Sequence, residues 1–377
     1  MSIATQRPVV AMVLPPREGF MAGRVGAIGL LAHSAAAAPG AFASVVLGAA
    51  QSEPFADARF VPVSLSWWPA GRSRRYAGGA AAVVRRLRPA LVEVHNRLDI
   101  ALFLARRFPH IPVWAFLNND PQGMRGGYTA ADRTHALAAL ARIGTSSAYL
   151  QRRLLEGVAP PARPPLVLPN WLDLALVPAS PPERDRVILF AGRIVADKGA
   201  DSFVRAAARA LPSLPGWRAE MIGADRFAPD SPDTAYVTAL RREAEAAGVA
   251  MLGYRPHGAV LAAMARAAIV VVPSRWPEPF GLTALEAMAA GAALLVSDRG
   301  GLGEFTAGAS VTIDPDDPET LGAAMLAVAT DPSRRAALAE AGRRRAEAYS
   351  VAQGVARLDA LRREILAGWS KRPGSPI

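Results

Sequence analysis

Short apolar runs alternate along the chain with longer stretches whose apolar positions recur every three or four residues. In the first half, the short runs predict strands at 9–14, 43–47, 91–94, 113–117, 143–146 and 166–168. Helical spacing predicts helices between them, at 24–37, 76–87, 98–108, 130–141 and 148–156. Such alternation is typical of a doubly wound, mostly parallel sheet.

Two polar, proline-rich segments, 160–165 and 178–185, then predict a domain boundary near 170–185. Beyond it the pattern restarts, with strands expected at 187–191, 219–222, 249–252, 269–273 and 293–297. Helices are expected near 199–211, 234–247, 257–266, 282–290, 318–329, 333–347 and 352–367. The predicted fold class is α/β, with two Rossmann-like doubly wound domains, 1–172 and 173–351, facing across a cleft. Ligands in such sheets bind at the C-terminal ends of the strands.

Composition excludes several classes of protein but does not indicate a particular function. The 377 residues are 51% hydrophobic and 20% charged, which suits two well-packed domains. No apolar run approaches the roughly 20 residues that span a bilayer, and residues 1–7 lack the apolar segment of a signal peptide, so a cytoplasmic location is the default. The absence of cysteine excludes disulfides, a thiolate nucleophile and a cysteine metal site.

The net charge of +11 comes entirely from residues 1–172, which hold 19 arginines, no lysine and eight acidic residues. Such a basic half would attract a polyanion, for example an anionic lipid surface or a phosphorylated acceptor. A general preference for arginine is the alternative, but it does not explain the asymmetry between the halves. The chain has only two lysines, Lys198 and Lys371, and Lys371 lies in a polar tail. A compact ammonium group is therefore expected to matter at Lys198.

The segment 278–286, EPFGLTALE, carries the most specific chemistry. It joins a buried strand to a helix that ends at Gly291, and it places Glu278 in the loop and Glu286 inside the helix. A helix N-terminus at a strand end is a ready anion site. Two further cations, Arg193 and Lys198, stand between two glycines in another strand-to-helix loop, 192–199.

These motifs resemble those of the retaining glycosyltransferases of family 4, which have the two-domain GT-B fold. The resemblance covers GRIVADKG (192–199), residues 249–274, EPFGLTALEAMAAG (278–291) and SDRGGLGE (297–304). It implies that Arg193 and Lys198 bind the donor diphosphate, that Glu278 contacts the transferred sugar and that Glu286 binds the ribose. The expected donor site is completed by Gly192, Arg255, Thr283 and the backbone amides of Phe280, Gly281 and Leu282.

The resemblance also assigns roles to the domains. Residues 1–172 would bind the acceptor, with the C-terminal helix, about 352–377, packing back on them, and residues 173–351 would bind the nucleotide sugar. The segment 167–170 with Asp173 matches the family's interdomain Pro-Asn-Gly region, where Trp171 replaces the glycine as a change in linker packing. Acceptor-side residues are expected at Gly19 and Phe20, at His95 and Asn96, and at Asn118 and Asp120. Asn118 stands where the family often has a histidine; it can form hydrogen bonds but cannot titrate. His95 is equally well explained as a structural residue.

The chemistry implied by the resemblance needs neither a cofactor nor a metal. Arg193, Lys198 and the helix dipole would stabilise the departing diphosphate, whose oxygen would take the acceptor proton in a front-face reaction. Glu278 would then orient the sugar and stabilise the transition state rather than act as a nucleophile. Asp314 and Asp316 form an Asp-x-Asp motif that metal-dependent transferases use, but a turn with N-capping acids is the better explanation.

One surface segment suggests where the enzyme works. Trp67 and Trp68 precede a basic cluster of Arg72, Arg74 and Arg75, which would suit docking on the inner face of an anionic membrane. An ordinary loop leading into a surface helix explains the segment equally well.

The leading hypothesis is a retaining glycosyltransferase that moves a sugar from a UDP- or GDP-sugar to a glycan or lipid-linked acceptor, in cell-surface polysaccharide or lipopolysaccharide synthesis. The alternatives are a non-catalytic sugar-nucleotide-binding protein and a GT-B-type sugar-nucleotide epimerase. Nucleic acid is disfavoured, because aromatic residues do not interleave with the basic ones beyond the Trp67 segment. The donor base, the sugar and the acceptor stay open.

Overall fold

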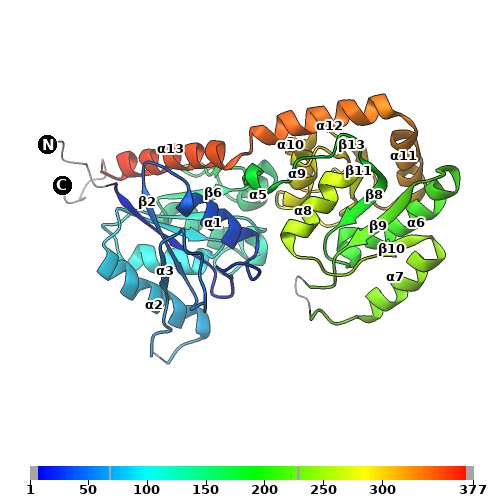
Figure 1. Cartoon of the computed structure of the whole chain (residues 1–377). Helices are drawn as coiled ribbons and strands as arrows, with labels where there is room; N and C mark the ends of the chain where they lie inside the picture. The colour runs from blue at the N-terminus through cyan, green and yellow to red at the C-terminus, as the bar shows by residue number, and fades with distance from the viewer. Residues whose placement is uncertain (1–6, 68, 227–229, 371–377) are drawn as a thin grey trace. The chain divides into compact units, whose positions relative to one another are not determined.

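The computed structural model describes residues 7–67, 69–226 and 230–370. The chain divides into two compact units (Figure 1). The first contains Met1–Trp171 together with Val351–Ile377, and the second contains Leu172–Ser350. The chain therefore passes between the units twice. Lys371 lies outside the described residues.

The first unit is built on a parallel seven-stranded sheet in the order β3-β2-β1-β4-β5-β6-β7. Its strands are β1 (Val9–Val13), β2 (Ala43–Gly48), β3 (Phe60–Pro62), β4 (Leu91–His95), β5 (Val113–Leu117), β6 (Arg142–Thr145) and β7 (Leu166–Val167). Its helices are α1 (Ala27–Ala37), α2 (Arg72–Leu87), α3 (Leu98–Arg107), α4 (Ala130–Ala139), α5 (Ala148–Leu155) and α13 (Val351–Ser370).

Helices cover both faces of this sheet, because its strands are apolar on both sides. On one face, alternate strand residues such as Ala11 and Val13 pack against α2, α3, α4 and α5. On the other, Val10 and Met12 pack with residues of α1 and α13. The C-terminal helix thus belongs to the first unit, although the whole second unit separates it in sequence.

A buried ion pair fixes α13 to the sheet. Arg362 is 1% exposed, and its Nε and Nη2 donate to Oε2 of the fully buried Glu93 in β4, at 3.1 and 3.0 Å. Arg362 Nη1 also contacts Asp359, whose Oδ2 accepts from the backbone N–H of Ala41 at 2.6 Å. Burial would raise the pKa of Glu93, but the guanidinium of Arg362 and the hydrogen bond from His95 hold it below its usual value.

The second unit repeats the design with a parallel six-stranded sheet in the order β10-β9-β8-β11-β12-β13. Its strands are β8 (Asp185–Ala191), β9 (Arg218–Ile222), β10 (Val249–Met251), β11 (Ala267–Val272), β12 (Ala293–Ser297) and β13 (Val311–Ile313). One face packs on α6 (Ala200–Ala210), α7 (Ala235–Ala246) and α11 (Pro318–Thr330). The other packs on α8 (His257–Arg266), α9 (Leu282–Ala289), α10 (Leu302–Thr306) and α12 (Pro332–Glu347).

The predicted fold class of two Rossmann-like doubly wound sheets is confirmed. The three-residue β3 and the five-residue α10 were not predicted, because both are too short to show a period. Trp171 is more than a change in linker packing: it is buried, stacks on Phe116 at 6.5 Å and donates from Nε1 to Ser34 Oγ at 2.8 Å. Among the described residues, no helix is both long and apolar enough to cross a membrane.

Candidate functional site

The loop after β8 carries the first predicted motif. Gly192 and the half-buried Arg193 follow the strand, and Lys198 ends a short 3-10 turn, Ala196–Lys198. Gly199 then opens α6 with φ of 68°, and a Cβ there would lie 1.9 Å from the carbonyl oxygen of Pro273. Only glycine fits this close approach of two loops, which brings the end of β8 against the end of β11.

Glu278 lies beside Lys198 and is held by two other loops. Its Oε1 is ion-paired with Lys198 Nζ and accepts a hydrogen bond from the buried Ser274 Oγ at 2.8 Å. Its backbone carbonyl accepts from the N–H of Gly301 at 2.7 Å, which ties the loop to the end of β12. Lys198 and Ser274 therefore hold the carboxylate of Glu278, and Gly301 holds its backbone.

The start of α9 meets the same loop. Gly281 caps the helix with φ of 103°, where a Cβ would lie 2.3 Å from Leu302 Cδ2. The Phe280 ring is buried and stacks on Phe305 at 4.6 Å, which leaves its backbone rather than its side chain for any ligand. Leu282 and Thr283 form the first turn and are half-buried. The turn combines N–H groups with the positive end of the helix dipole.

Glu286 lies one turn further along α9 and has a partner that was not predicted. Its Oε1 lies 2.7 Å from Nε2 of His257, the first residue of α8. The hydrogen bond that His257 donates to Glu286 raises the pKa of His257 above its ordinary value. Arg255, two residues earlier, is exposed and donates to the carbonyl of Tyr254 at 2.9 Å.

Arginines and acidic residues in and next to these loops form a network of ion pairs. Arg275 pairs with Asp201 at 2.7 Å and with Asp316 at 2.9 Å, and Arg299 pairs with Asp316 at 3.0 Å. Burial would raise the pKa of Asp201, but its hydrogen bonds from Arg275 and Tyr236 hold it below its usual value.

Both acidic residues of the Asp-x-Asp motif belong to the same network. Asp316 is neutralised by two arginines, and Asp314 Oδ1 accepts from the backbone N–H of Asp316 at 3.0 Å and lies 3.5 Å from Arg299. The neighbouring Asp317 caps α11. In the part of the chain that the structure describes, no cluster of His, Asp or Glu has the arrangement of a metal site.

Arg193 differs from the other cations at this edge. Within the described ranges its guanidinium forms no hydrogen bond or ion pair, whereas Lys198 and Arg275 are each paired with a carboxylate. A half-buried arginine without a partner at a strand end is available to an anion.

The acceptor-side residues predicted in the first unit occupy varied positions. Gly19 packs tightly, since a Cβ there would lie 1.9 Å from the carbonyl oxygen of Arg24. Phe20 is fully buried among Phe55, Phe60 and His33, so only its backbone could meet a ligand.

The other acceptor-side residues follow β4 and β5. His95 Nε2 lies 2.8 Å from Glu93, and Asn96, with φ of 56°, accepts from the backbone N–H groups of Asn118 and Asn119. Asp120 caps a 3-10 turn and pairs with Arg153 of α5 at 2.8 Å.

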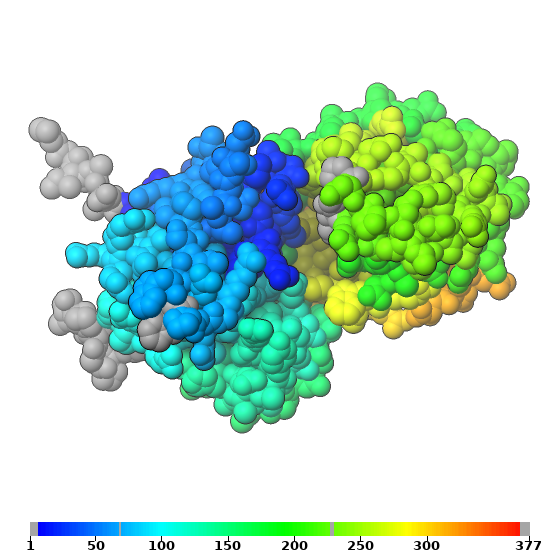
Figure 2. All heavy atoms as spheres, turned by 90° about the horizontal axis from the view of Figure 1, so that it is seen from below, coloured from blue at the N-terminus to red at the C-terminus, as the bar shows by residue number. Residues whose placement is uncertain are grey.

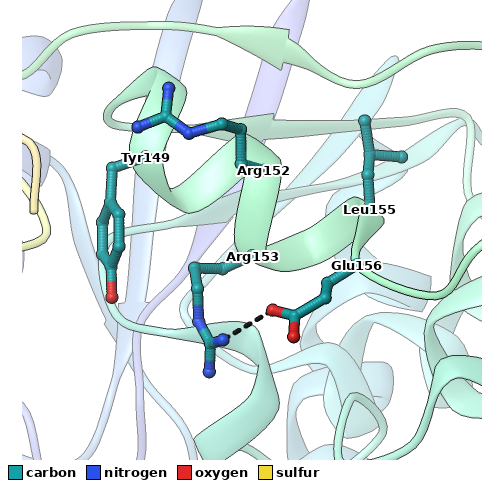
Figure 3. Close-up of a pocket in the computed structure, with 5 residues that line it drawn as sticks. All are labelled: Tyr149, Arg152, Arg153, Leu155 and Glu156. Carbon is teal, nitrogen blue, oxygen red and sulfur yellow. Dashed lines mark hydrogen bonds and ion pairs between the residues drawn. The ribbon is translucent and has the colours of Figure 1, made fainter.

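A shallow hollow of about 380 Å³ lies beside this last pair, on α5 (Figure 3). It is lined by Tyr149, Arg152, Arg153, Leu155 and Glu156. Arg153 turns toward Glu156 and contacts it at 2.6 Å. Arg153 is shared between Asp120 and Glu156, and the hollow contains no residue predicted for the donor site.

Sequence reasoning missed Ser274, His257 and Arg275. Ser274 lies two residues past the end of the buried strand β11, a position that could have marked it as a residue of the carboxyl edge. His257 and Arg275 gave no local signal, because their partners lie 29 and 74 positions away.

The two doubly wound units together form a GT-B fold. Among solved structures, HepE from Anabaena in complex with UDP has a TM-score of 0.75 at 16% identity, covering 95% of this chain and 100% of that one. Sucrose-phosphate synthase from Thermosynechococcus elongatus has a TM-score of 0.74 at 18% identity, covering 96% and 100%. At these identities the likeness establishes the fold alone.

A family model matches most of the second unit. Residues 177–345 match the family described as glycosyl transferases group 1. The predicted resemblance is thereby confirmed over these residues, and the match supports the predicted enzyme class, a glycosyltransferase, while membership of family 4 in particular stays a prediction.

Two curated relatives are similar to this chain over part of their length. A glycogen synthase of Mycobacterium tuberculosis is 29% identical over 276 residues, which are 69% of this chain and 65% of that protein. A D-inositol 3-phosphate glycosyltransferase of Thermobispora bispora is 35% identical over 183 residues, 47% of this chain and 42% of that protein. The chain thus spans less than two thirds of the length of either relative.

Proposed function

We propose that the protein is a retaining glycosyltransferase that moves a sugar from a UDP- or GDP-sugar to a glycan or lipid-linked acceptor. The observation that carries the proposal is the grouping of Arg193, Lys198, Glu278 and the α9 N-terminus at one carboxyl edge of the second sheet. A diphosphate needs cations and N–H donors, and a sugar needs a fixed hydrogen-bond acceptor; this edge supplies both. Glu286, on the same helix, would accept from the two ribose hydroxyls.

The reaction would break the bond between the anomeric carbon and the diphosphate oxygen and form a bond from that carbon to the acceptor oxygen. The acceptor proton would pass to the departing diphosphate oxygen. Arg193 and Lys198 would stabilise the negative charge that develops there, and Glu278 would hold the sugar. No metal is needed in this scheme, because two cations and a helix dipole take its place and Asp316 is already paired with arginines.

The acceptor is the least constrained part of the proposal. Synthesis of a cell-surface polysaccharide or lipopolysaccharide, in the cytoplasm or at the inner face of the membrane, fits the basic first unit. The relatives named glycogen synthase and D-inositol 3-phosphate glycosyltransferase add an α-glucan and an inositol phosphate to the acceptors worth testing. The structures of HepE with UDP and UDP-glucose support a uracil donor as the first to try.

The decisive experiment combines nucleotide binding with donor turnover. UDP or GDP is expected to raise the melting temperature of the wild type, since a ligand present at 100 times its Kd stabilises the folded state by about 2.7 kcal/mol. A panel of UDP- and GDP-sugars, with and without acceptors, should then give one donor that is hydrolysed or transferred, with Glu278→Ala strongly impaired. Stabilisation without turnover would indicate the non-catalytic binding protein, and release of an altered nucleotide sugar would indicate the epimerase. Unimpaired Glu278→Ala would refute the site.

Membrane docking is proposed from the loop before α2. Trp67 is 85% exposed and Leu65 40% exposed, and the exposed Arg72 and Arg74 follow them, while Trp68 lies outside the described residues. Figure 2 shows this light-blue part of the chain at the surface of the first unit. Arg75 has a different role from its neighbours, because its Nε donates to the carbonyl of Ser66 at 2.8 Å and holds the loop.

Replacing both Arg72 and Arg74 by glutamate is expected to weaken binding to vesicles of phosphatidylcholine and phosphatidylglycerol by at least about tenfold, since each arginine near such a surface contributes about 1 kcal/mol. Vesicle sedimentation measures the change, and Arg75 is left in place to preserve the loop. The matched control replaces the exposed Arg85 and Arg86, at the other end of α2, by glutamate. Equal losses in both double variants would show general charge attraction rather than docking by this loop.

A further inference from the structure

The pair His257–Glu286 joins the starts of two neighbouring helices at the carboxyl edge of the second sheet. Helix α8 follows β10 and α9 follows β11, so both begin at this edge. They pack against each other on the same face of the sheet (Figure 1). Nε2 of His257, the first residue of α8, lies 2.7 Å from Oε1 of Glu286, the fifth residue of α9. One hydrogen bond therefore links the start of α8 to a carboxylate inside α9.

Glu286 needs this partner because its surroundings are apolar. The residue is 9% exposed, and Leu285 and Ala287 on either side of it are fully buried in the core. A carboxylate in such surroundings costs free energy unless a hydrogen bond or an opposite charge compensates it. Of the residues that the structure describes, His257 is the one whose side chain hydrogen-bonds to this carboxylate. The histidine therefore determines where the carboxylate lies.

The paired carboxylate keeps the capacity to accept further hydrogen bonds. An ionised carboxylate has about four lone-pair sites on its two oxygens. His257 uses one of them, and Oε2 forms no hydrogen bond to any described residue. The Glu286 side chain is 12% exposed, so it is not sealed from solvent. Two adjacent hydroxyl groups of one ligand can then donate to it together, one to each oxygen.

Helix geometry directs the carboxylate toward the proposed position of the diphosphate. Side chains of an α-helix lean toward its N-terminus. Glu286 lies four residues beyond Leu282, the first residue of α9, which is about 6 Å along the helix axis. The ribose of a nucleoside diphosphate is joined directly to its phosphates. A diphosphate at the α9 N-terminus would therefore bring the ribose within reach of Glu286.

Stability gives little reason for the pair. The His257 side chain is 39% exposed, and ion pairs with this much exposure contribute little to the free energy of folding. The pair of Arg362 and Glu93 is a contrast, because both side chains are almost completely buried and fix α13 to the sheet. The main effect of His257 is then on the orientation of the Glu286 side chain. A side chain that is already held in place loses little conformational entropy when a ligand binds.

We infer that His257 is a positioning residue, which holds the Glu286 carboxylate in place for the two ribose hydroxyls and so gives the donor site a preference for ribonucleotides over 2′-deoxyribonucleotides. The inference rests on the proposed function, which places a nucleotide sugar at this edge, and it adds a residue and a selectivity to that function. The competing role for His257 is a purely structural link between α8 and α9.

UDP and 2′-deoxy-UDP separate the two roles, because they differ in a single hydroxyl group. Isothermal titration calorimetry on the full chain is expected to show that the wild type binds UDP about 10-fold to 100-fold more tightly, the usual effect of a hydrogen bond to a charged group. In His257→Ala, UDP should bind about tenfold more weakly and 2′-deoxy-UDP less than about threefold more weakly, so that the preference shrinks. GDP and 2′-deoxy-GDP replace this pair if the protein binds GDP alone.

Further variants test whether His257 acts through Glu286. His257→Gln keeps an N–H donor close to the position of Nε2 and should recover most of the preference. His257→Phe keeps a ring without an N–H; it should behave as His257→Ala does, and it replaces that variant if the alanine variant does not fold. In a Glu286→Ala background, His257→Ala should change the affinity for UDP by less than about twofold, because a positioning residue has no effect without its partner. The matched control is His135→Ala, at an exposed histidine of α4, which should bind both nucleotides as the wild type does.

Equal losses of affinity for UDP and 2′-deoxy-UDP in His257→Ala would indicate the structural link and overturn the inference, as would an unchanged preference. Further weakening in the Glu286→Ala background would mean that His257 contacts the nucleotide itself, which also contradicts a positioning role. A wild type that binds both nucleotides equally would overturn the inference and leave the proposed function intact. A wild type that binds neither UDP nor GDP would refute the proposed function, and the inference with it.

Discussion

Lys198→Ala is expected to lower the rate of sugar transfer by about 100-fold to 1,000-fold, the usual cost of removing one preorganised group from a developing negative charge. Lys198 is ion-paired with Glu278 in the structure, so the substitution also leaves that carboxylate with Ser274 as its one remaining partner among the described residues. Affinity for UDP or GDP should fall together with kcat, because the ammonium group would contact the diphosphate before and after the sugar leaves. Steady-state kinetics and nucleotide titration with the donor identified above measure both effects.

Two controls sharpen this result. Arg344→Ala removes one positive charge from an exposed side chain of α12, and transfer should stay at the wild-type rate. Lys198→Arg keeps the charge but places a planar guanidinium where a compact ammonium group lies between two loops, and it should recover only part of the activity. Full activity in Lys198→Ala would contradict the assignment of this residue to the diphosphate.

The largest loss of stability is expected from Arg362→Met. The substitution leaves the fully buried Glu93 with His95 as its main partner, and uncompensated buried charges of this kind cost about 3–5 kcal/mol. Urea unfolding followed by circular dichroism should show the loss in the transition of the first unit. The proposed donor site of the second unit contains neither residue, so nucleotide binding should persist below that transition.

The reverse experiment distinguishes charge from packing. Combining Glu93→Leu with Arg362→Met removes both charges of this pair, and it should regain part of the lost free energy of unfolding, because a buried ion pair can often be replaced by apolar residues at little cost. The recovery is partial because the buried Asp359 also loses its contact with Arg362. If the double variant were as unstable as Arg362→Met, the charge on Glu93 would not be the cause. The loss would then come from Asp359, which no longer contacts Arg362, or from packing around Phe42, over which the guanidinium lies at 5.8 Å.

The sequence was most informative where chemistry and backbone are local. Lys198 and Glu278 lie in strand-to-helix loops that contain glycines, and such loops can be recognised from the sequence alone. The structure shows why glycine stands there, because Gly199 and Gly281 both adopt positive φ. The alternation of apolar runs likewise predicted both sheets, because strand and helix periods are properties of short windows.

Contacts between distant segments could not be predicted in the same way. Glu286 was recognised on its helix, but His257 was not assigned to it, since nothing in the sequence pairs two residues across different helices. Glu93 shows the same limit: a glutamate in the apolar run LVEVH is unusual, yet its partner lies 269 positions later in α13. Short elements such as β3 and α10 could not be predicted for another reason: three to five residues contain less than two periods of a strand or helix pattern.

The membership of α13 in the first unit has a practical meaning for shortened forms of this protein. A chain that stopped at Ser350 would keep every residue of the 177–345 match and would still be recognised as a glycosyltransferase from its sequence. It would lack Leu358, Leu361 and Ile365, which fill one face of the first sheet. Truncated gene copies and expression fragments that look intact by motif would therefore yield a folded donor half beside an N-terminal half whose core lies open to solvent.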